Sequence, residues 1–179
     1  MGKGAINDPS TSWPATIRRM LSDGHQIASH TWSHQKLTEL SETQFRRQIL
    51  FNEIALADLL DGRFPTYMRP PHSMSDGTTD AWLGELGYHV TYFDLNTRGY
   101  ENNSPEKIGE SMGIWDERMT VEEAGTGRGH VLHIEHDPLF HAVYNLTEHM
   151  LESLAESDFK AVTVGECLGD PEENWYRSV

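Results

Sequence analysis

Residues 24–34 read GHQIASHTWSH, and this stretch decides how the rest of the chain is interpreted. Gly24 ends a helical pattern, and residues 25–29 have the character of a short strand. His30 and His34 follow that strand directly, in a polar segment. A strand that ends in chemically active side chains is typical of an α/β protein, in which such residues collect at the carboxyl ends of the strands.

Helical and strand patterns alternate on both sides of this stretch. Ser41 and Gln44 form a capping box at the start of a long helical pattern that Gly62 ends. We expect helices at 14–22, 41–61, 78–86, 104–119 and 141–156, and strands at 25–29, 66–68, 88–93, 131–135 and 160–164. This alternation predicts βαβ units and a parallel sheet or barrel. No linker or repeat divides the chain, so we expect one domain over residues 1–179.

Composition narrows the classes of partner. The net charge of -14 makes nucleic acid a poor partner, whereas a neutral or cationic polymer meets no repulsion. No apolar run is long enough to span a membrane, and residues 1–12 lack the apolar stretch of a signal peptide. Cys167 is the single cysteine, which excludes an intrachain disulfide and a thiolate-cluster zinc site.

Polar side chains follow four of the expected strands. His30 and His34 come after the first, Arg69 after the second, Asp94 after the third and His136 after the fourth. Because the carboxyl ends of parallel strands meet at one rim, these residues form a candidate site.

His30 and His34 are four residues apart, a spacing that brings both imidazoles to one side, as a metal ion requires. A structural or incidental histidine pair is the alternative interpretation. The position directly after a strand favours the metal-site interpretation.

Residues 69–72 read RPPH, an unusual combination. The two prolines fix the backbone and remove two donors, so the N–H of His72 is held at a defined place. A preorganised N–H at the rim suits a developing oxyanion. The alternative is a rigid loop in which Arg69 makes a surface ion pair.

His136 is the histidine expected to face the rim. His133 lies an odd number of positions away on the same expected strand and should face the opposite side. We interpret His133 and His130 as surface or packing residues.

Together these segments resemble the NodB-homology polysaccharide deacetylases, carbohydrate esterase family four. Residues 24–34 resemble the family's histidine motif, and YMRPPH at 67–72 resembles its arginine motif. DLNTRGY at 94–100 and IEHD at 134–137 resemble its acidic-aromatic and final histidine motifs. VGECLG at 164–169 and NWY at 174–176 resemble fungal chitin deacetylases in particular. The resemblance runs along nearly the whole chain and implies a distorted (β/α) barrel.

The resemblance implies a metal-dependent hydrolase that removes N-acetyl groups from chitin or a related N-acetylglucosamine polysaccharide. It implies a divalent metal, usually zinc and alternatively cobalt, held by His30, His34 and an aspartate. A metal-bound water attacks the N-acetyl carbonyl in this family. The metal and the backbone N–H at the position of His72 stabilise the oxyanion.

The resemblance implies roles for five further residues. His136 protonates the departing amine, and Asp94 orients and tunes it. Arg69 holds the catalytic base, and Tyr100 and Leu132 line the acetyl pocket.

Three departures from the family pattern are visible. The family's first motif, Thr-Phe-Asp-Asp-Gly, supplies the base and the third metal ligand, and it has no counterpart in this chain. Residues 2–10 resemble the loop after that motif, so we expect a barrel that is incomplete at its N-terminal side and little turnover by this chain alone. Gly99-Tyr100 stands where many members have Asp-Trp, and His72 where many have Tyr.

Three functions remain open at this point. The first is a deacetylase. The second is a catalytically inactive pseudoenzyme that binds carbohydrate, and the third is a metal-binding protein of related fold. The family implies a secreted or cell-wall protein.

Overall fold

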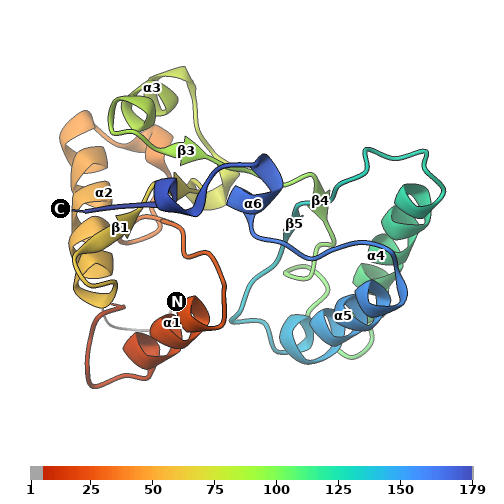
Figure 1. The fold of residues 1–179 in the computed structure, drawn as a ribbon. Helices are drawn as coiled ribbons and strands as arrows, with labels where there is room; N and C mark the ends of the chain where they lie inside the picture. Colours follow the sequence, from red (N-terminus) through yellow and green to blue (C-terminus); the bar gives the residue numbers. More distant parts are fainter. Residues whose placement is uncertain (1–5, 179) are drawn as a thin grey trace. The chain divides into compact units, whose positions relative to one another are not determined.

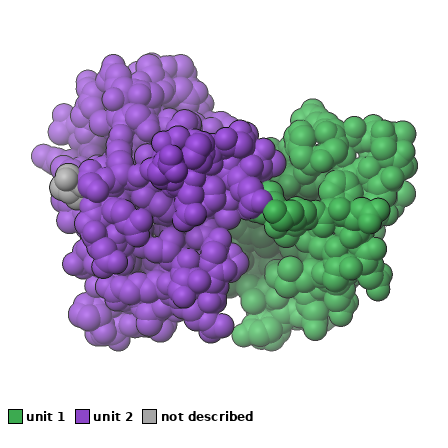
Figure 2. All heavy atoms as spheres, in the orientation of Figure 1, with its two compact units in different colours: residues 1, 93–162 green, residues 2–92, 163–179 purple. Residues whose placement is uncertain are grey.

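The computed structural model describes residues 6–178, which form two compact units (Figures 1 and 2). Unit 2 comprises residues 6–92 and 163–178, and unit 1 comprises residues 93–162. Helices and short strands alternate in both, so the chain has an α/β fold.

Unit 2 contains four helices and four strands within the described residues. The helices are α1 (Trp13–Ser22), α2 (Glu42–Leu59), α3 (Gly77–Glu85) and α6 (Val164–Leu168), with short turns η1 (Leu37–Glu39), η2 (Pro71–Ser73) and η4 (Glu172–Asn174). The strands are β1 (Arg63–Pro65), β2 (Tyr67–Met68), β3 (His89–Val90) and β6 (Tyr176–Ser178).

Helix α2 organises the apolar core of this unit. Its N-terminus has the predicted capping box, in which the Ser41 hydroxyl accepts from Gln44 N and the Gln44 side chain accepts from Ser41 N. One part of its apolar face joins β2 and α3 in a cluster of Leu37, Phe45, Ile49, Met68, Leu83 and Tyr88. The following turns pack with α1 in a second cluster of Ile27, Leu56, Leu59 and Leu60.

Two small sheets complete unit 2. Strands β2 and β3 pair in parallel, with Tyr67 opposite His89, and Ser29 forms a parallel bridge to Met68. The predicted strand 25–29 is therefore reduced to this single bridge. Strands β1 and β6 pair antiparallel, with Arg63 opposite Ser178, so the C-terminal segment lies beside β1.

Unit 1 is built on one parallel pair of strands and two helices. Its elements are β4 (Leu95–Asn96), α4 (Ile108–Glu123), β5 (His133–Ile134), the π-helical turn η3 (Ala142–Leu146) and α5 (Thr147–Glu156). Leu95 lies opposite His133 across the strand pair. The core consists of Leu95, Ile108, Trp115, Met119, Leu146 and Met150.

The sequence predicted the helices better than the strands. Every expected helix is present, although α4 begins at Ile108 rather than at residue 104. The strand expected at 160–164 is wrong, because the Thr163 hydroxyl accepts from Glu166 N and so caps α6. Within residues 6–178 the strands form three separate two-stranded sheets, so barrel closure stays a prediction, as does the single domain. No helix among the described residues could cross a membrane.

The core position of Phe45 can be tested by substitution. Phe45 is 0% exposed, and its replacement by alanine should lower the free energy of unfolding by about 3–5 kcal/mol, because a cavity replaces the ring. Phe51 lies on the same helix but is 44% exposed. Phe51→Ala is the matched control and should cost less than about 1 kcal/mol in urea unfolding. Equal losses for the two variants would contradict the assigned orientation of α2.

Candidate functional site

The two predicted metal-ligating histidines lie next to each other in unit 2. The ring centroids of His30 and His34 are 4.8 Å apart. Two residues of this turn have left-handed backbone conformations, with φ of 70° at Thr31 and 57° at His34. Such conformations are costly for residues other than glycine, above all for a β-branched one, and they collect where function requires a particular geometry.

Helix α2 holds this turn through polar side chains on its core face. Ser33 N donates to Gln48 Oε1 at 2.8 Å, and Trp32 N donates to the Gln48 carbonyl at 3.0 Å. One turn further along the helix, the buried Asn52 amide donates to Ser29 Oγ at 2.9 Å. Buried polar groups normally occur where they complete such bonds, so Gln48 and Asn52 fix the backbone that carries both histidines.

The arginine motif fixes the orientation of His30. Arg69 N donates to the Ser29 carbonyl at 3.0 Å, which aligns the two segments. His30 Nδ1 lies 2.5 Å from the Arg69 carbonyl oxygen, which can only accept a hydrogen bond. His30 therefore carries its proton on Nδ1 when neutral, and the lone pair lies on Nε2, the atom that would face a metal. Burial lowers the pKa of the Arg69 guanidinium.

The turn at residues 70–73 orients the backbone of His72. His72 and Ser73 have φ of 58° and 52°, and Ser73 N donates to the Pro70 carbonyl at 3.1 Å. No hydrogen bond within residues 6–178 uses the N–H of His72. The His72 ring is 4.6 Å from that of His34. The RPPH motif thus places the His72 ring beside that of His34, whereas a role for the His72 N–H towards an oxyanion stays a prediction.

The histidine pair matches part of a metal site. Neutral imidazoles are common zinc ligands, and the His30 tautomer is the one that a ligand requires. Across residues 6–178, no three His, Cys, Asp or Glu side chains are grouped so that they could hold an ion. The described residues therefore offer two ligands, whereas a zinc site normally has at least three from the protein.

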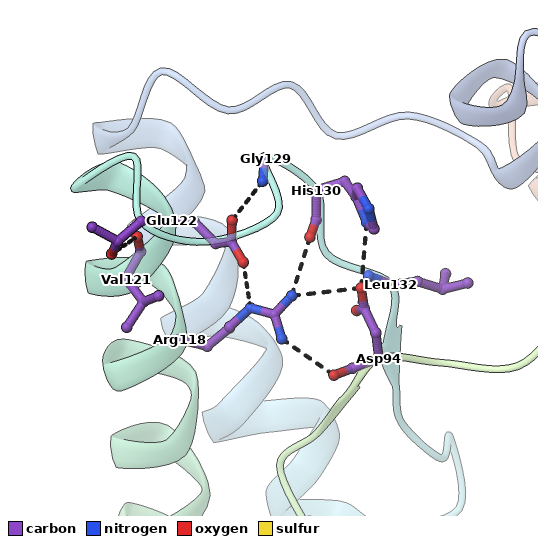
Figure 3. A network of polar contacts seen from close by, with 8 residues as sticks. Asp94, Arg118, Val121, Glu122, Gly129, His130 and Leu132 are labelled. Carbon is purple, nitrogen blue, oxygen red and sulfur yellow. Dashed lines mark hydrogen bonds and ion pairs between the residues drawn. The ribbon is translucent and has the colours of Figure 1, made fainter.

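Asp94 lies in a polar network of unit 1 (Figure 3). Its carboxylate accepts from Leu132 N at 2.7 Å and pairs with His130 Nδ1 at 3.3 Å and with Arg118 at 3.5 Å. Arg118 Nε also donates to the buried Glu122 at 2.6 Å. The network joins α4 to the start of β4 and to the segment before β5.

His136 follows β5 and has two neighbours of chemical interest. Its ring packs edge-on against Tyr100 at 5.5 Å between centroids, and the Tyr100 hydroxyl accepts from Asn96. Glu135 Oε1 is 3.8 Å from His136 Nδ1. No described contact joins Asp94 to His136, so direct orientation of His136 by Asp94 stays a prediction without a supporting contact.

His133 has the structural role that the sequence assigned to it. It lies 2.7 Å from the buried Thr97 hydroxyl and packs against Trp115. Burial, and then the charge of His136, lowers the pKa of His133 to about 4. These contacts and the lowered pKa favour the neutral form of His133, which agrees with a packing role.

Each unit thus groups part of the predicted set. Unit 2 groups His30, His34, Arg69 and His72, and unit 1 contains Asp94, Tyr100, Leu132 and His136. Sequence reasoning missed Gln48, Asn52, Arg118 and Glu135. Gln48 and Asn52 could have been found, because they interrupt the apolar face of a predicted helix at helical spacing.

Known proteins match this chain along most of its length. The family model described as polysaccharide deacetylase matches residues 4–91. The chitin deacetylase of Colletotrichum lindemuthianum is 38% identical over 177 residues, which cover 99% of this chain and 70% of that protein. Its solved structure superposes with a TM-score of 0.87 over 94% of this chain and 73% of that chain.

Two further relatives are less similar. A chitin deacetylase of Arthroderma benhamiae is 35% identical over 90% of this chain, but the chain spans only 42% of that protein. The structure of the peptidoglycan deacetylase PdaC from Bacillus subtilis has a TM-score of 0.73 at 20% identity, over 88% of this chain and 70% of that chain. The latter likeness concerns the fold alone.

The buried, neutral state of His133 predicts a pH dependence of stability. Between its folded pKa of about 4 and the ordinary histidine pKa of 6.5, the unfolded chain binds this proton more readily than the folded one does. The free energy of unfolding should therefore fall as pH drops from 6.5 towards 4, by roughly 1–3 kcal/mol. His133→Asn should remove this part of the acid destabilisation in urea titrations. The exposed His25→Asn is the control, and an equal effect of both would contradict the assignment.

Proposed function

Because this chain belongs to the polysaccharide deacetylase family, we propose that it carries out metal-dependent removal of N-acetyl groups from chitin or chitin oligosaccharides. The observation that most supports the proposal is the bond of His30 Nδ1 to the Arg69 carbonyl, beside His34. It orients an imidazole so that Nε2 could bind a metal, and it joins the segment at 24–34 to the segment at 67–72.

We assign His30 and His34 as two ligands of a divalent metal, zinc or alternatively cobalt. Such an ion would polarise the acetamido carbonyl and activate water for attack. The Arg69 carbonyl would keep the His30 ring from turning. The backbone N–H of His72 would donate to the carbonyl oxygen as negative charge develops on it.

The remaining roles fall to residues of unit 1. His136 would donate a proton to the sugar nitrogen as the carbon–nitrogen bond breaks, so that acetate and a free amine leave. Tyr100 and Leu132 would contact the acetyl group. Asp94 accepts from Leu132 N, and we assign it to holding that segment in place. Arg69 would position the base.

The charge of the chain agrees with such a substrate. A chain of net charge -14 does not repel a neutral N-acetylated polymer, and it attracts a product that becomes cationic on deacetylation. Nucleic acid stays an unfavourable partner, because the net negative charge of the chain repels a polyanion.

Metal binding is tested by calorimetric titration with zinc. We expect one weak site, whose affinity drops on His30→Ala and again on His34→Ala, because each substitution removes one imidazole ligand. His25→Ala, at an exposed histidine outside this group, should leave the affinity unchanged. Nanomolar affinity that survives both ligand substitutions would refute the site.

Catalysis is tested by measuring the acetate that the protein, as it occurs naturally, releases from N-acetylglucosamine oligomers. We expect release that depends on added zinc or cobalt. His136→Ala should reduce kcat by about a hundredfold or more while zinc binding is retained, since a proton donor is lost.

Two results would contradict the proposal. Oligomer binding without acetate release would identify a carbohydrate-binding pseudoenzyme. Full activity of His136→Ala would show that another group protonates the amine.

A further inference from the structure

The carboxylate of Glu135 occupies the space where a side chain at Gly99 would stand. A Cβ built on Gly99 would collide with this carboxylate, and Oε1 would lie only 2.7 Å from it. Gly99 is buried, and the three atoms nearest to such a Cβ all belong to the Glu135 side chain. Residue 99 must therefore be glycine for Glu135 to adopt this position.

Further contacts restrict the same carboxylate. Oε1 accepts from His136 N at 2.9 Å, and the fully buried Thr97 hydroxyl donates to Oε2 at 3.4 Å. The Glu135 side chain is only 16% exposed. An exposed glutamate on a loop would not be held in this way, so the position of this carboxylate is defined by the fold.

The His136 ring turns one nitrogen towards that carboxylate. Its Nδ1 is buried and has no hydrogen-bond partner within residues 6–178, although the side chain as a whole is 41% exposed. A buried polar atom normally has a partner. Glu135 Oε1 is 3.8 Å away, about 1 Å beyond the length of a charge-assisted hydrogen bond. A small rotation of either side chain closes the gap.

We propose that Glu135 is a positioning residue for His136: its carboxylate accepts a hydrogen bond from Nδ1–H, the proton stays on the ring, and Nε2 is directed towards the reacting group. Nδ1 is buried whereas the side chain as a whole is 41% exposed, so we assign Nε2 as the nitrogen that gives a proton to the departing amine. A carboxylate that fixes the tautomer and orientation of a catalytic imidazole is a general device in hydrolases. The inference rests on the proposed function only for the identity of the proton acceptor.

Other groups near His136 fit this role less well. The Asp94 carboxylate is engaged with Arg118, His130 and Leu132 N. Tyr100 contacts His136 through a T-shaped packing of the two rings and not through a hydrogen bond. His133 is held by Thr97.

The tautomer of His136 can be read directly by nitrogen NMR of the imidazole side chains. In alkaline solution, where imidazoles are neutral, the native protein should show His136 with its proton on Nδ1. The signal is assigned by its disappearance in His136→Asn. Glu135→Ala should shift the population towards the Nε2-protonated form, because the acceptor at Nδ1 is gone. Glu117→Gln, at an exposed glutamate of α4, is the matched control and should change nothing.

A second variant tests the same contact without removing the carboxylate. Gly99→Ala should displace Glu135 and shift the His136 tautomer in the same direction, but less far. If Glu135→Ala fails to fold, Gly99→Ala alone decides the matter. In the double variant Gly99→Asp/Glu135→Ala, a carboxylate returns to the emptied space and should restore the Nδ1-protonated form.

Activity provides an independent measurement. Glu135→Ala should lower kcat by up to about a hundredfold with little change in KM. A misplaced catalytic group reduces the stabilisation of the transition state but leaves substrate binding unchanged. A tautomer unchanged by both Glu135→Ala and Gly99→Ala would overturn the inference while leaving the proposed deacetylase intact. The predicted tautomer shifts without any acetate release would overturn the deacetylase proposal and leave the positioning contact standing.

Discussion

Two amide side chains on the core face of α2 hold the backbone that carries the histidine pair. Gln48 and Asn52 are almost fully buried, and both form hydrogen bonds to the segment from Ser29 to Ser33; Gln48 also donates to Gln35. Leaving such groups unpaired in the core would cost about 1–3 kcal/mol each, so helix and turn are tied to one another. The capping box and the buried apolar residues fix the position of α2, and with it the position of the two amides relative to the turn. The position of His30 beside the Arg69 carbonyl follows from this attachment.

Backbone strain is concentrated where chemistry is expected. Among residues 6–178, left-handed conformations at non-glycine residues occur within the motifs at Thr31, His34, His72 and Arg98. Ser73 follows one motif directly, and Asp61 is the remaining case in this part of the chain. Each costs of order 1–3 kcal/mol and persists only where surrounding contacts enforce it. In unit 2 those contacts come from α2 and from the proline pair. The strain orients imidazoles and an N–H donor that relaxed loops would leave mobile, which is consistent with a preorganised site.

Unit 1 is held differently, by a partly buried network of charges in which Glu122 is the buried member. Arg118 bridges Asp94 and Glu122, and the Gly129 N–H and then Arg118 lower the pKa of Glu122. Removing one partner of a buried pair is strongly destabilising, since the other charge is left uncompensated. The network therefore fixes the start of β4 against the segment that leads into β5. His136 and Glu135 lie just beyond that strand, so their placement depends on charges that are far from them in sequence.

The sequence by itself determined the helices, the order of the motifs and the family. Helical spacing, capping residues and the HxxxH and RPPH segments are local signals, and local physics suffices to interpret them. The pairing of β1 with β6 and the reduction of the strand at 25–29 to one bridge could not be predicted, because strand pairing joins distant residues. Likewise, Glu135 lies within the IEHD segment, but no motif assigned it a role. Only the tertiary structure showed that its carboxylate lies against Gly99 and faces the buried Nδ1 of His136, because that proximity depends on how β4 and β5 pair.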